Sequence, residues 1–451
     1  MDVKGCNVLV AGSGKSGIGA ADLLKKYGAN IMIYDGNEKL NKEDILNKLE
    51  DSTDVEVILG ELSDDTIEIV DLMILSPGIP VDAPFVNRVR EAATPIWGEI
   101  ELAYVASKGK LVAITGTNGK TTTTALVGEI MEAYFDKVDV VGNIGNPYTT
   151  TAYDSTDDTV TVAEISSFQL ETIHTFHPNV SAVLNITPDH LNRHYTMECY
   201  TDCKMRIAEN QNPDEPIILN YEDSILREYA KKLTNKIIWF SSQQKVDCGV
   251  YLDGENIMYR DEHGDVFVTT VNDTTLVGIH NTENIMAAIA ISMSMGVPVD
   301  VIREAVKKFK AVPHRIEYVK TVNDVIYYND SKGTNTDASI KAIEAMTRPT
   351  ILIAGGYDKK VSFDEWADSF GEKIKYLVLL GQTAEQIAET VKKKGFTNIV
   401  FAKDLKEVVD QCYKLAEPGD AVLLSPACAS WGMFDNYEQR GDMFKEYVNA
   451  L

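Results

Sequence analysis

Hydrophobic residues in the first hundred positions follow two alternating patterns. Short apolar runs at residues 6–12, 30–35 and 71–80 predict strands, and residues 16–28 have the periodicity of an amphipathic helix that ends at Gly28. Because strands that alternate with helices build parallel sheets, this segment predicts a doubly wound, Rossmann-like domain.

The same alternation begins again twice further along the chain. One series opens at residues 110–115, continues through 159–165 and 179–187, and runs on to a helix at 281–296. The next series consists of apolar runs at 325–330, 350–356, 376–381, 397–402 and 420–427.

Chain length agrees with this division, because 451 residues suit about three domains of roughly 150 residues each. We therefore predict three consecutive α/β domains with mainly parallel sheets. They are a Rossmann-like domain at residues 1–98, a P-loop-like domain at 99–311 and a second Rossmann-like domain at 312–451.

Composition excludes several classes of protein. The 68 Asp and Glu outnumber the 43 Lys and Arg, giving a net charge of -25, and no basic stripe suggests nucleic acid as a partner. No apolar run approaches the ~20 residues that span a membrane, and the N-terminal residues lack a signal-peptide pattern. Six cysteines without a C-x-x-C pair predict neither a disulfide framework nor a thiolate zinc site. We expect a reduced, cytoplasmic protein, and a monomer.

Two glycine-rich loops each follow a predicted strand and precede a helix. The loop Gly12–Gly17 fits G-x-G-x-x-G, and Asp35 ends the next strand at about the ~20-residue distance expected of a ribose-contacting acid. This pattern favours a nucleotide or dinucleotide over a turn made only for packing. Neither loop has strict P-loop spacing, since Leu9 and Ile114 occupy the position of the first required glycine.

The second loop, "TGTNGKTTT", has the stronger context for ATP. Lys120 follows Gly119 and can reach the β- and γ-phosphates, while the hydroxyl of Thr121 can bind Mg²⁺. Four successive threonines are poor helix formers, a cost that metal and phosphate contacts would offset. The alternative is a strand-to-helix turn with a solvated lysine. We assign ATP to this loop.

Mg²⁺ bound to ATP needs further ligands near the loop. Glu164 ends one predicted buried strand, and Asp189 and His190 follow another. His190 and His194 are four residues apart, as in a helical zinc motif, but Leu191 stands where the metalloprotease motif has glutamate. Magnesium or plain hydrogen bonding is therefore favoured over zinc.

Longer segments resemble a known family. In order, they are TGTNGKTTT, GNIGNP, EISSFQLE, NITPDHLNRH, HNTENIMAAIA, PHRIEYV, NDSKGTNTDA and LLSPACASWGMFDNYEQRG. They resemble the Mur ligases over essentially the whole chain. The middle motifs are shared with folylpolyglutamate synthase, whereas the two C-terminal motifs resemble the D-glutamate-adding members. The DNPR string of the diaminopimelate-adding ligase is absent.

This resemblance implies an ATP-dependent amide ligase of peptidoglycan precursor synthesis. The carboxylate of UDP-N-acetylmuramoyl-L-alanine would attack the γ-phosphate of ATP, and the amine of D-glutamate would displace phosphate from the resulting acyl phosphate. The UDP-substrate would bind domain 1–98, ATP domain 99–311 and the amino acid domain 312–451. Two Mg²⁺ ions are implied as cofactors.

The resemblance also implies roles for individual residues. Catalytic roles fall on Lys120, Lys204 and His190, and metal ligation on Thr121, Glu164, His190 and Lys204. ATP contacts fall on Gly116, Thr117, Asn118, Gly119, Lys120, Thr121, Thr122, Asn281, Asn284, Arg315 and Asp330. Substrate contacts fall on Ser16, Asp35, Ser76, Gly78, Asn143, Lys332, Thr334, Lys359, Ser430 and Tyr437.

For Lys204, the neighbouring residues and the family resemblance lead to different expectations. As a helical lysine between Cys203 and Met205, it is expected to be solvated or salt-bridged. The segment resembles the family's carbamylated lysine, in which CO₂ on the amine makes an anionic metal ligand. That chemistry requires a buried lysine with a lowered pKa.

Two positions depart from the family pattern. Asn37 stands where some members carry an arginine that could stack on uracil, and Tyr357 stands where some carry an acid, so that Asp358 is an alternative. Three other functions remain to be weighed: another amide ligase of the family, an NAD-dependent oxidoreductase read from the first loop alone, and a non-catalytic nucleotide sensor. Neither non-ligase function accounts for glycine loops in two domains and a lysine-bearing third domain.

Overall fold

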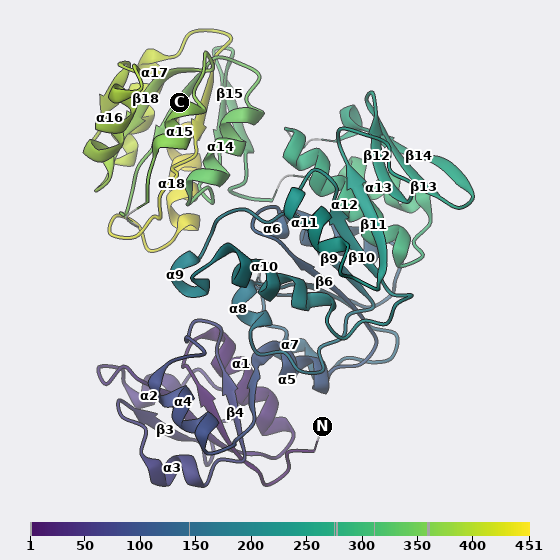
Figure 1. Ribbon diagram of the computed structural model, residues 1–451. Coiled ribbons are helices and arrows are strands. Elements are labelled where there is room, and N and C mark those ends of the chain that lie inside the picture. The colour runs from purple at the N-terminus through teal and green to yellow at the C-terminus, as the bar shows by residue number, and fades with distance from the viewer. Residues whose placement is uncertain (1, 144, 275, 277, 311, 359–360) are drawn as a thin grey trace. The chain divides into compact units, whose positions relative to one another are not determined.

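Three sheets flanked by helices follow one another along the chain (Figure 1). The computed structural model describes residues 2–143, 145–274, 276, 278–310, 312–358 and 361–451. The chain divides into two compact units: residues up to 273 together with 283–307, and residues 274–282 together with 308–451. The first unit holds two sheets and the second holds one. The prediction of three α/β domains with mainly parallel sheets is confirmed.

The first sheet has five parallel strands in the order β3-β2-β1-β4-β5. Its elements are β1 (Asn7–Ala11), α1 (Lys15–Lys26), β2 (Asn30–Asp35), α2 (Lys42–Leu46), β3 (Glu56–Leu59), α3 (Asp64–Glu68), β4 (Leu72–Leu75), α4 (Pro84–Glu91) and β5 (Ile96–Gly98). Alternate strand residues face opposite sides, so Val8 and Val10 pack with α1, whereas Leu9 and Ala11 pack with α3 and α4. The strand order reverses between β1 and β4, which places the Gly12–Gly17 loop at a topological switch point.

The second sheet has nine strands in the order β14-β13-β12-β11-β10-β9-β6-β8-β7. Its elements are α5 (Glu99–Ala106), β6 (Lys110–Thr115), α6 (Lys120–Glu132), β7 (Val138–Gly142), α7 (Thr149–Ala152), β8 (Val160–Glu164), α8 (Ser167–Leu170), β9 (Val180–Val183), α9 (Leu191–His194), α10 (Met197–Met205), a 3₁₀ turn (Arg206–Ala208), β10 (Pro216–Asn220), α11 (Ser224–Ala230), β11 (Lys236–Ser241), β12 (Gly249–Asp253), β13 (Asn256–Asp261), β14 (Gly264–Thr270), a second 3₁₀ turn (Val271–Asp273), α12 (Ile279–Ser294) and α13 (Val299–Lys308). The strands from β7 to β12 pair in parallel, and β13 and β14 extend the edge as an antiparallel ribbon.

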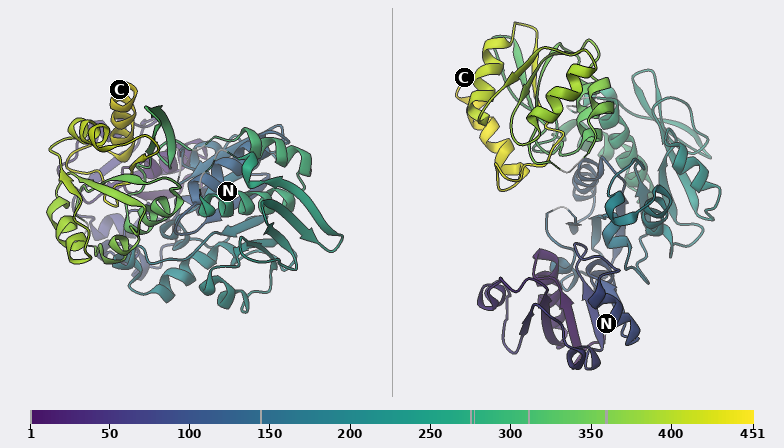
Figure 2. Two further views of the ribbon diagram at one scale, coloured as in Figure 1. Left: turned by 90° about the horizontal axis from the view of Figure 1, so that it is seen from above. Right: turned by 60° about the vertical axis from the view of Figure 1, so that its left-hand side comes forward.

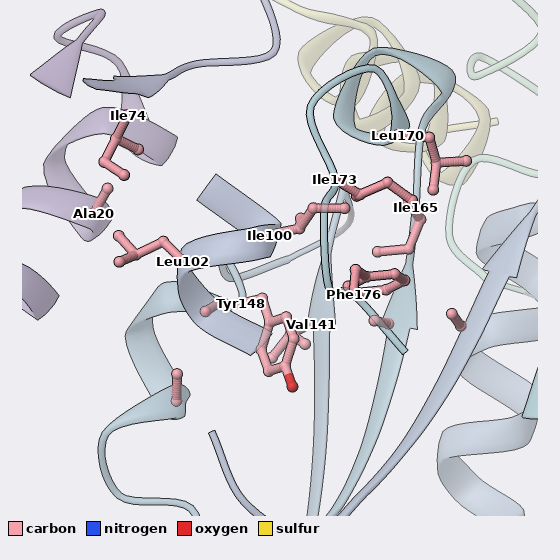
Figure 3. Packing of buried hydrophobic residues seen from close by; sticks show 14 of the residues in the cluster. Ala20, Ile74, Ile100, Leu102, Val141, Tyr148, Ile165, Leu170, Ile173 and Phe176 are labelled. Atoms are coloured by element: carbon pink, nitrogen blue, oxygen red, sulfur yellow. The ribbon is translucent and has the colours of Figure 1, made fainter. Parts of the chain in front are cut away.

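Helix α5 packs between the first two sheets. Ile100 and Leu102 of this helix are fully buried, and α5 contacts both α1 and α7. The hydrophobic cluster around them includes Ala20 and Ile74 on one side and Phe176 on the other (Figure 3). Continuous apolar packing therefore joins the first two domains into one compact unit.

The third sheet has six strands in the order β15-β16-β20-β17-β18-β19, and all described pairs except β15–β16 are parallel. Its elements are β15 (Glu317–Val322), β16 (Val325–Asn329), α14 (Thr336–Ala345), β17 (Thr350–Ala354), α15 (Asp364–Asp368), β18 (Ile374–Leu379), α16 (Ala384–Lys393), β19 (Ile399–Phe401), α17 (Leu405–Leu415), β20 (Ala421–Leu424) and α18 (Tyr437–Asn449). Helices α14, α15 and α16 cover one face of this sheet, and α17 and α18 cover the other (Figure 2).

No helix in the described part of the chain combines the length and the apolar character needed to cross a membrane.

Candidate active site

The lysine-bearing loop connects β6 to α6 at the carboxyl edge of the second sheet. Gly116 and Gly119 have φ values of 148° and 85°, which side-chain-bearing residues rarely adopt. A Cβ on Gly119 would lie 2.2 Å from Oδ1 of Asn284, so the α12 side chain packs directly against the loop. The open backbone turn and the N-terminus of α6 together provide the donors of an anion site.

The segment after β9 holds this loop in place. Asn185 accepts a hydrogen bond from the Asn118 amide at 2.8 Å and donates one to the Asn118 carbonyl at 3.0 Å. Oγ1 of Thr117 accepts from the Thr187 amide at 3.0 Å and lies 3.1 Å from the Tyr200 hydroxyl. Neither Asn185 nor Tyr200 was predicted from the sequence. Asn185 lies two residues after β9, a buried strand that pairs with β6, and this position was the available signal.

Two lysines converge on one backbone carbonyl of the loop. Nζ of Lys120 donates to the oxygens of Gly116 and Thr117, each at 2.8 Å, and Nζ of Lys204 donates to the same Gly116 oxygen at 2.8 Å. Lys204 is only 2% exposed, and its ammonium lies 4.8 Å from the ring centre of Tyr200. Burial and the neighbouring Lys120 charge lower the pKa of Lys204 well below its usual range.

The expectation of a solvated or salt-bridged Lys204 is therefore wrong. The last turn of α10 lies under the loop, and no carboxylate among the described residues forms an ion pair with this lysine. The surrounding fold removes the Lys204 amine from water, which lowers its pKa. The local sequence does not reveal this burial.

Glu164 presents a carboxylate with one unused oxygen. It ends β8 beside β6, is 2% exposed, and accepts a hydrogen bond at 2.8 Å from the side chain of Asn143. Its Oε2 is buried and has no hydrogen-bond partner among the described residues. Because such an oxygen is costly without a partner, Glu164 fits a metal ligand. No three His, Cys, Asp or Glu of the described chain lie close enough to hold a metal unaided, so other ligand types would complete this site.

The two histidines after β9 differ in environment. His190 has a left-handed backbone, is about half exposed at its side chain, and lies 3.5 Å from Asp189. His194 is buried, with Nε2 3.0 Å from the hydroxyl of Ser167. Burial, followed by the charge of His190, lowers the pKa of His194 to about 4. His194 is therefore neutral near pH 7 and packs on the ring of Phe168.

The first glycine loop is tied to Asp35. Oδ2 of Asp35 accepts from the amide and the hydroxyl of Ser13 at 3.2 and 2.6 Å, and Oδ1 accepts from the Asn37 amide at 3.1 Å. Burial raises the pKa of Asp35, but these hydrogen bonds outweigh it and lower the pKa overall. A Cβ on Gly12 would lie 2.6 Å from Oγ of Ser76, a buried hydroxyl without a partner among the described residues.

In the second unit, Asp330 follows β16 in a buried position. Its Oδ2 accepts from the Ser425 hydroxyl at 2.7 Å and its Oδ1 from the Ile316 amide at 3.3 Å. Burial raises the pKa of Asp330 to about 7, against the hydrogen bond from Ser425 and the charge of Arg315. The carboxyl is therefore partly protonated near neutral pH.

Lys332, two residues after Asp330, lies close to the ring of Tyr437. Nζ of Lys332 lies 5.4 Å from the centre of the Tyr437 ring, and the Thr334 amide donates to the Lys332 carbonyl at 2.8 Å. Ser430 is 4% exposed in the loop after β20. Tyr357 is 41% exposed, with its ring 5.5 Å from that of Trp431.

The predicted residues thus form three groups. In the first unit, the group around the lysine loop is Gly116, Thr117, Asn118, Gly119, Lys120, Thr121, Thr122, Asn143, Glu164, Lys204 and Asn284, with His190 on the segment after β9. Around the first glycine loop are Ser16, Asp35, Ser76 and Gly78. The second unit carries Asn281, Arg315, Asp330, Lys332, Thr334, Ser430 and Tyr437. Lys359 lies outside the described residues.

Comparison with known proteins gives a consistent result in all three domains. Residues 6–98 match the MurD-like N-terminal domain of Mur ligases, residues 114–292 the Mur ligase middle domain, and residues 314–428 the glutamate ligase domain of Mur ligases. Among solved structures, a MurF ligase from Thermotoga maritima in complex with ADP has a TM-score of 0.62 at 17% identity, covering 99% of this chain and 96% of that one. MurC from the same organism has a TM-score of 0.60 at 18% identity, covering 99% of each chain.

Curated relatives are much closer in sequence. The UDP-N-acetylmuramoylalanine--D-glutamate ligase of Lachnospira eligens is 57% identical over the full length of both chains. The relative of the same name from Lachnoclostridium phytofermentans is 54% identical, covering 100% of this chain and 99% of its own. The chain therefore belongs to the Mur ligase family, and these two curated relatives are named UDP-N-acetylmuramoylalanine--D-glutamate ligase.

Proposed function

We propose that this protein joins D-glutamate to UDP-N-acetylmuramoyl-L-alanine at the expense of ATP, forming ADP and phosphate. One observation carries the proposal: Lys120 and Lys204 converge on the ATP loop beside the unpartnered oxygen of Glu164, in a chain that matches ligases of this name from end to end. The arrangement suits phosphoryl transfer between two anions.

The chemistry proceeds in two steps. An oxygen of the alanine carboxylate attacks the γ-phosphorus of ATP, the bond to ADP breaks, and an acyl phosphate forms. The amine of D-glutamate then attacks the acyl carbon, phosphate leaves, and the amine loses a proton. Because the first step joins two negatively charged groups, positive charge at the loop is its main requirement.

Lys120 supplies part of that charge. Its hydrogen bonds to the Gly116 and Thr117 carbonyls hold the ammonium over the loop, where it would contact the β- and γ-phosphates. Thr121, Glu164, His190 and Lys204 are the residues that we assign to two Mg²⁺ ions. Bound there, Mg²⁺ would neutralise phosphate charge.

We assign a carbamate to Lys204. The uncharged amine is the form that adds to CO₂, and the burial of Lys204 beside Lys120 favours that form. The new N–C bond releases one proton and leaves an anion, which would compensate the Lys120 charge at the Gly116 carbonyl. Incubation with carbon-13 bicarbonate should give a carbamate NMR signal that Lys204→Met lacks. An unchanged spectrum in wild-type enzyme would remove this assignment.

The remaining assignments follow the three domains, with proposed boundaries at residues 98 and 311. Ser16, Asp35, Ser76, Gly78 and Asn143 would contact the UDP-substrate. Thr122, Asn281, Asn284, Arg315 and Asp330 would complete the ATP site. Lys332, Thr334, Lys359, Ser430 and Tyr437 would bind D-glutamate, since lysines and hydroxyls suit a dicarboxylate. We place the enzyme in the cytoplasm as a monomer.

An isotope experiment tests the proposed reaction. The alanine carboxylate of the UDP-substrate is labelled with oxygen-18, and the products with ATP and D-glutamate are analysed by mass spectrometry. The proposal predicts an amide product and one labelled oxygen in the released phosphate. Phosphate without label would exclude the acyl phosphate, and slow or absent ATP turnover with every candidate substrate would favour a nucleotide sensor.

A further inference from the structure

Arg440 is a buried cation outside every site assigned above. It lies in the first turn of α18, is 1% exposed, and forms no ion pair with a carboxylate in the described residues. Burial lowers its pKa to about 10, so the guanidinium stays charged at neutral pH. The charge of Asp330 opposes this lowering of the pKa without forming an ion pair, so the hydrogen bonds of the guanidinium must offset the rest of the cost of removing it from water.

The planar guanidinium group of Arg440 donates hydrogen bonds to two loops at once. Nε donates to Oγ of Ser331 at 2.9 Å, and Nη2 donates to the carbonyl oxygen of the same residue at 2.7 Å. Nη1 donates to the carbonyl oxygen of Cys428 at 3.2 Å. Ser331 belongs to the loop after β16 and Cys428 to the loop after β20, so one side chain spans both.

A third segment is attached through the same serine. Oγ of Ser331 donates at 2.8 Å to the carbonyl of Tyr437, the first residue of α18. The hydrogen bond from Ser425 to Asp330 links the ends of β16 and β20. The hydrogen bonds of Arg440 to Ser331 and Cys428, here called the Arg440 network, join residues further along the same two loops. Three segments that diverge from the sheet edge are thereby fixed to one another.

Each of these segments carries a residue that we assign to the amino-acid substrate. Lys332 follows Ser331, Ser430 lies two residues after Cys428, and Tyr437 supplies the ring next to Lys332. We infer that Arg440 is a positioning residue, which sets the separation of these three groups so that they receive the amino-acid dicarboxylate without rearrangement. This inference rests on the proposed function.

The fork geometry makes the role specific to arginine. A lysine at position 440 would keep the charge but could not donate simultaneously to Ser331 and Cys428 in one plane. Arg440→Lys should therefore raise the KM for the amine substrate about tenfold, as expected for roughly 1.4 kcal/mol of lost positioning. The KM for the UDP-substrate should change less than about twofold, because the residues assigned to it all lie in the first unit and the hydrogen bonds of Arg440 reach none of them.

The experiment compares wild type, Arg440→Lys, Ser331→Ala and a matched control, Arg348→Lys, a partly exposed arginine of the same unit paired with Asp324. KM is measured for whichever amine the wild type uses, so a different amine would correct the proposed function without removing the test. Ser331→Ala should raise the same KM, and the control should not.

Backbone hydrogen exchange provides a readout that does not depend on turnover. Arg440→Lys should increase exchange in residues 331–335 and 426–434 together, while residues 112–132 around the ATP loop stay protected. Unchanged exchange in both loops would overturn the inference. So would faster exchange accompanied by an unchanged KM for the amine, because Arg440 would then support the fold alone.

Discussion

At the scale of single residues, the interior of this protein holds several ionisable groups that burial would normally exclude. Lys204, Arg440 and Glu99 are each at most 2% exposed. Lys204 and Arg440 direct all their described hydrogen bonds to neutral oxygen acceptors, and Glu99 accepts one from Gln169 at 2.7 Å. Such groups persist where they serve the chemistry or hold other residues in place.

Loss of Lys204 should abolish turnover without preventing nucleotide binding. Lys204→Met fills a similar volume but cannot carry a carbamate, so we expect kcat to fall about a hundredfold or more. Affinity for an ATP analogue, measured by calorimetry, should stay within a few-fold of wild type. Lys236→Met, at an exposed lysine, serves as the control. Near-normal kcat in Lys204→Met would contradict a catalytic role.

Glu99 makes stability depend on pH. Burial raises the pKa of Glu99 to about 7 from an ordinary 4.5, so the folded state binds this proton more tightly than the unfolded state. Stability is therefore lost as pH rises from about 4.5 to about 7. Glu99→Gln can still accept from Gln169 and should be more stable than wild type at pH 8, by up to about 3 kcal/mol. Denaturant unfolding at pH 5 and pH 8 checks this, since the difference should shrink towards pH 5. A difference independent of pH would contradict the burial of an ionisable group.

Some of these buried or site residues could be predicted from the sequence, and others could not. Lys120 and Glu164 are recognisable because Lys120 follows the glycine loop after a buried strand, and Glu164 is the last residue of another buried strand. The burial of Lys204 was not predictable from its neighbours Cys203 and Met205, because it arises when α10 packs under a loop 88 residues away. Arg440 lies within the C-terminal motif, but the sequence did not reveal its hydrogen bonds, because its acceptors are two backbone oxygens and the hydroxyl of Ser331.

At the scale of elements, hydrophobic patterning identified the strands that build the parallel core. The apolar runs at residues 110–115 and 350–356 became β6 and β17 within one or two residues. The antiparallel ribbon β12–β14 was not predicted. β14 is mostly exposed, and charged residues such as Arg260 and Asp265 pair across the ribbon, so no continuous apolar run marks it.

The ATP loop itself offers a prediction at this scale. Gly119→Ala would place a methyl group 2.2 Å from Oδ1 of Asn284 at a φ of 85°, so either the loop or α12 must shift. At 1–3 kcal/mol of strain, the KM for ATP should rise roughly tenfold or more. Gly254→Ala, at a left-handed turn with open space around it, should cost stability but leave the KM for ATP unchanged. Equal effects of both variants on that KM would contradict a phosphate-binding conformation.

At the scale of the whole molecule, we propose that the three domains divide one reaction among separate binding tasks. Glycine loops occur at the carboxyl edges of the first two sheets, and a lysine-bearing loop follows β16 in the third domain. The acidic net charge of -25 supplies no general attraction for anionic substrates. In the proposed function, binding therefore depends on local donors such as Lys120 and Lys332.

The central claim is tested most directly by ATP-dependent phosphate release with UDP-N-acetylmuramoyl-L-alanine and one of four amines: D-glutamate, L-glutamate, L-lysine or diaminopimelate. We predict release that depends on D-glutamate and on the UDP-substrate together, is matched by an amide product, and is absent in Lys204→Met. Release with a different amine would keep the ligase chemistry and change the substrate. No release with any amine would contradict the assignment of Lys120 and Lys204 to a working catalytic site.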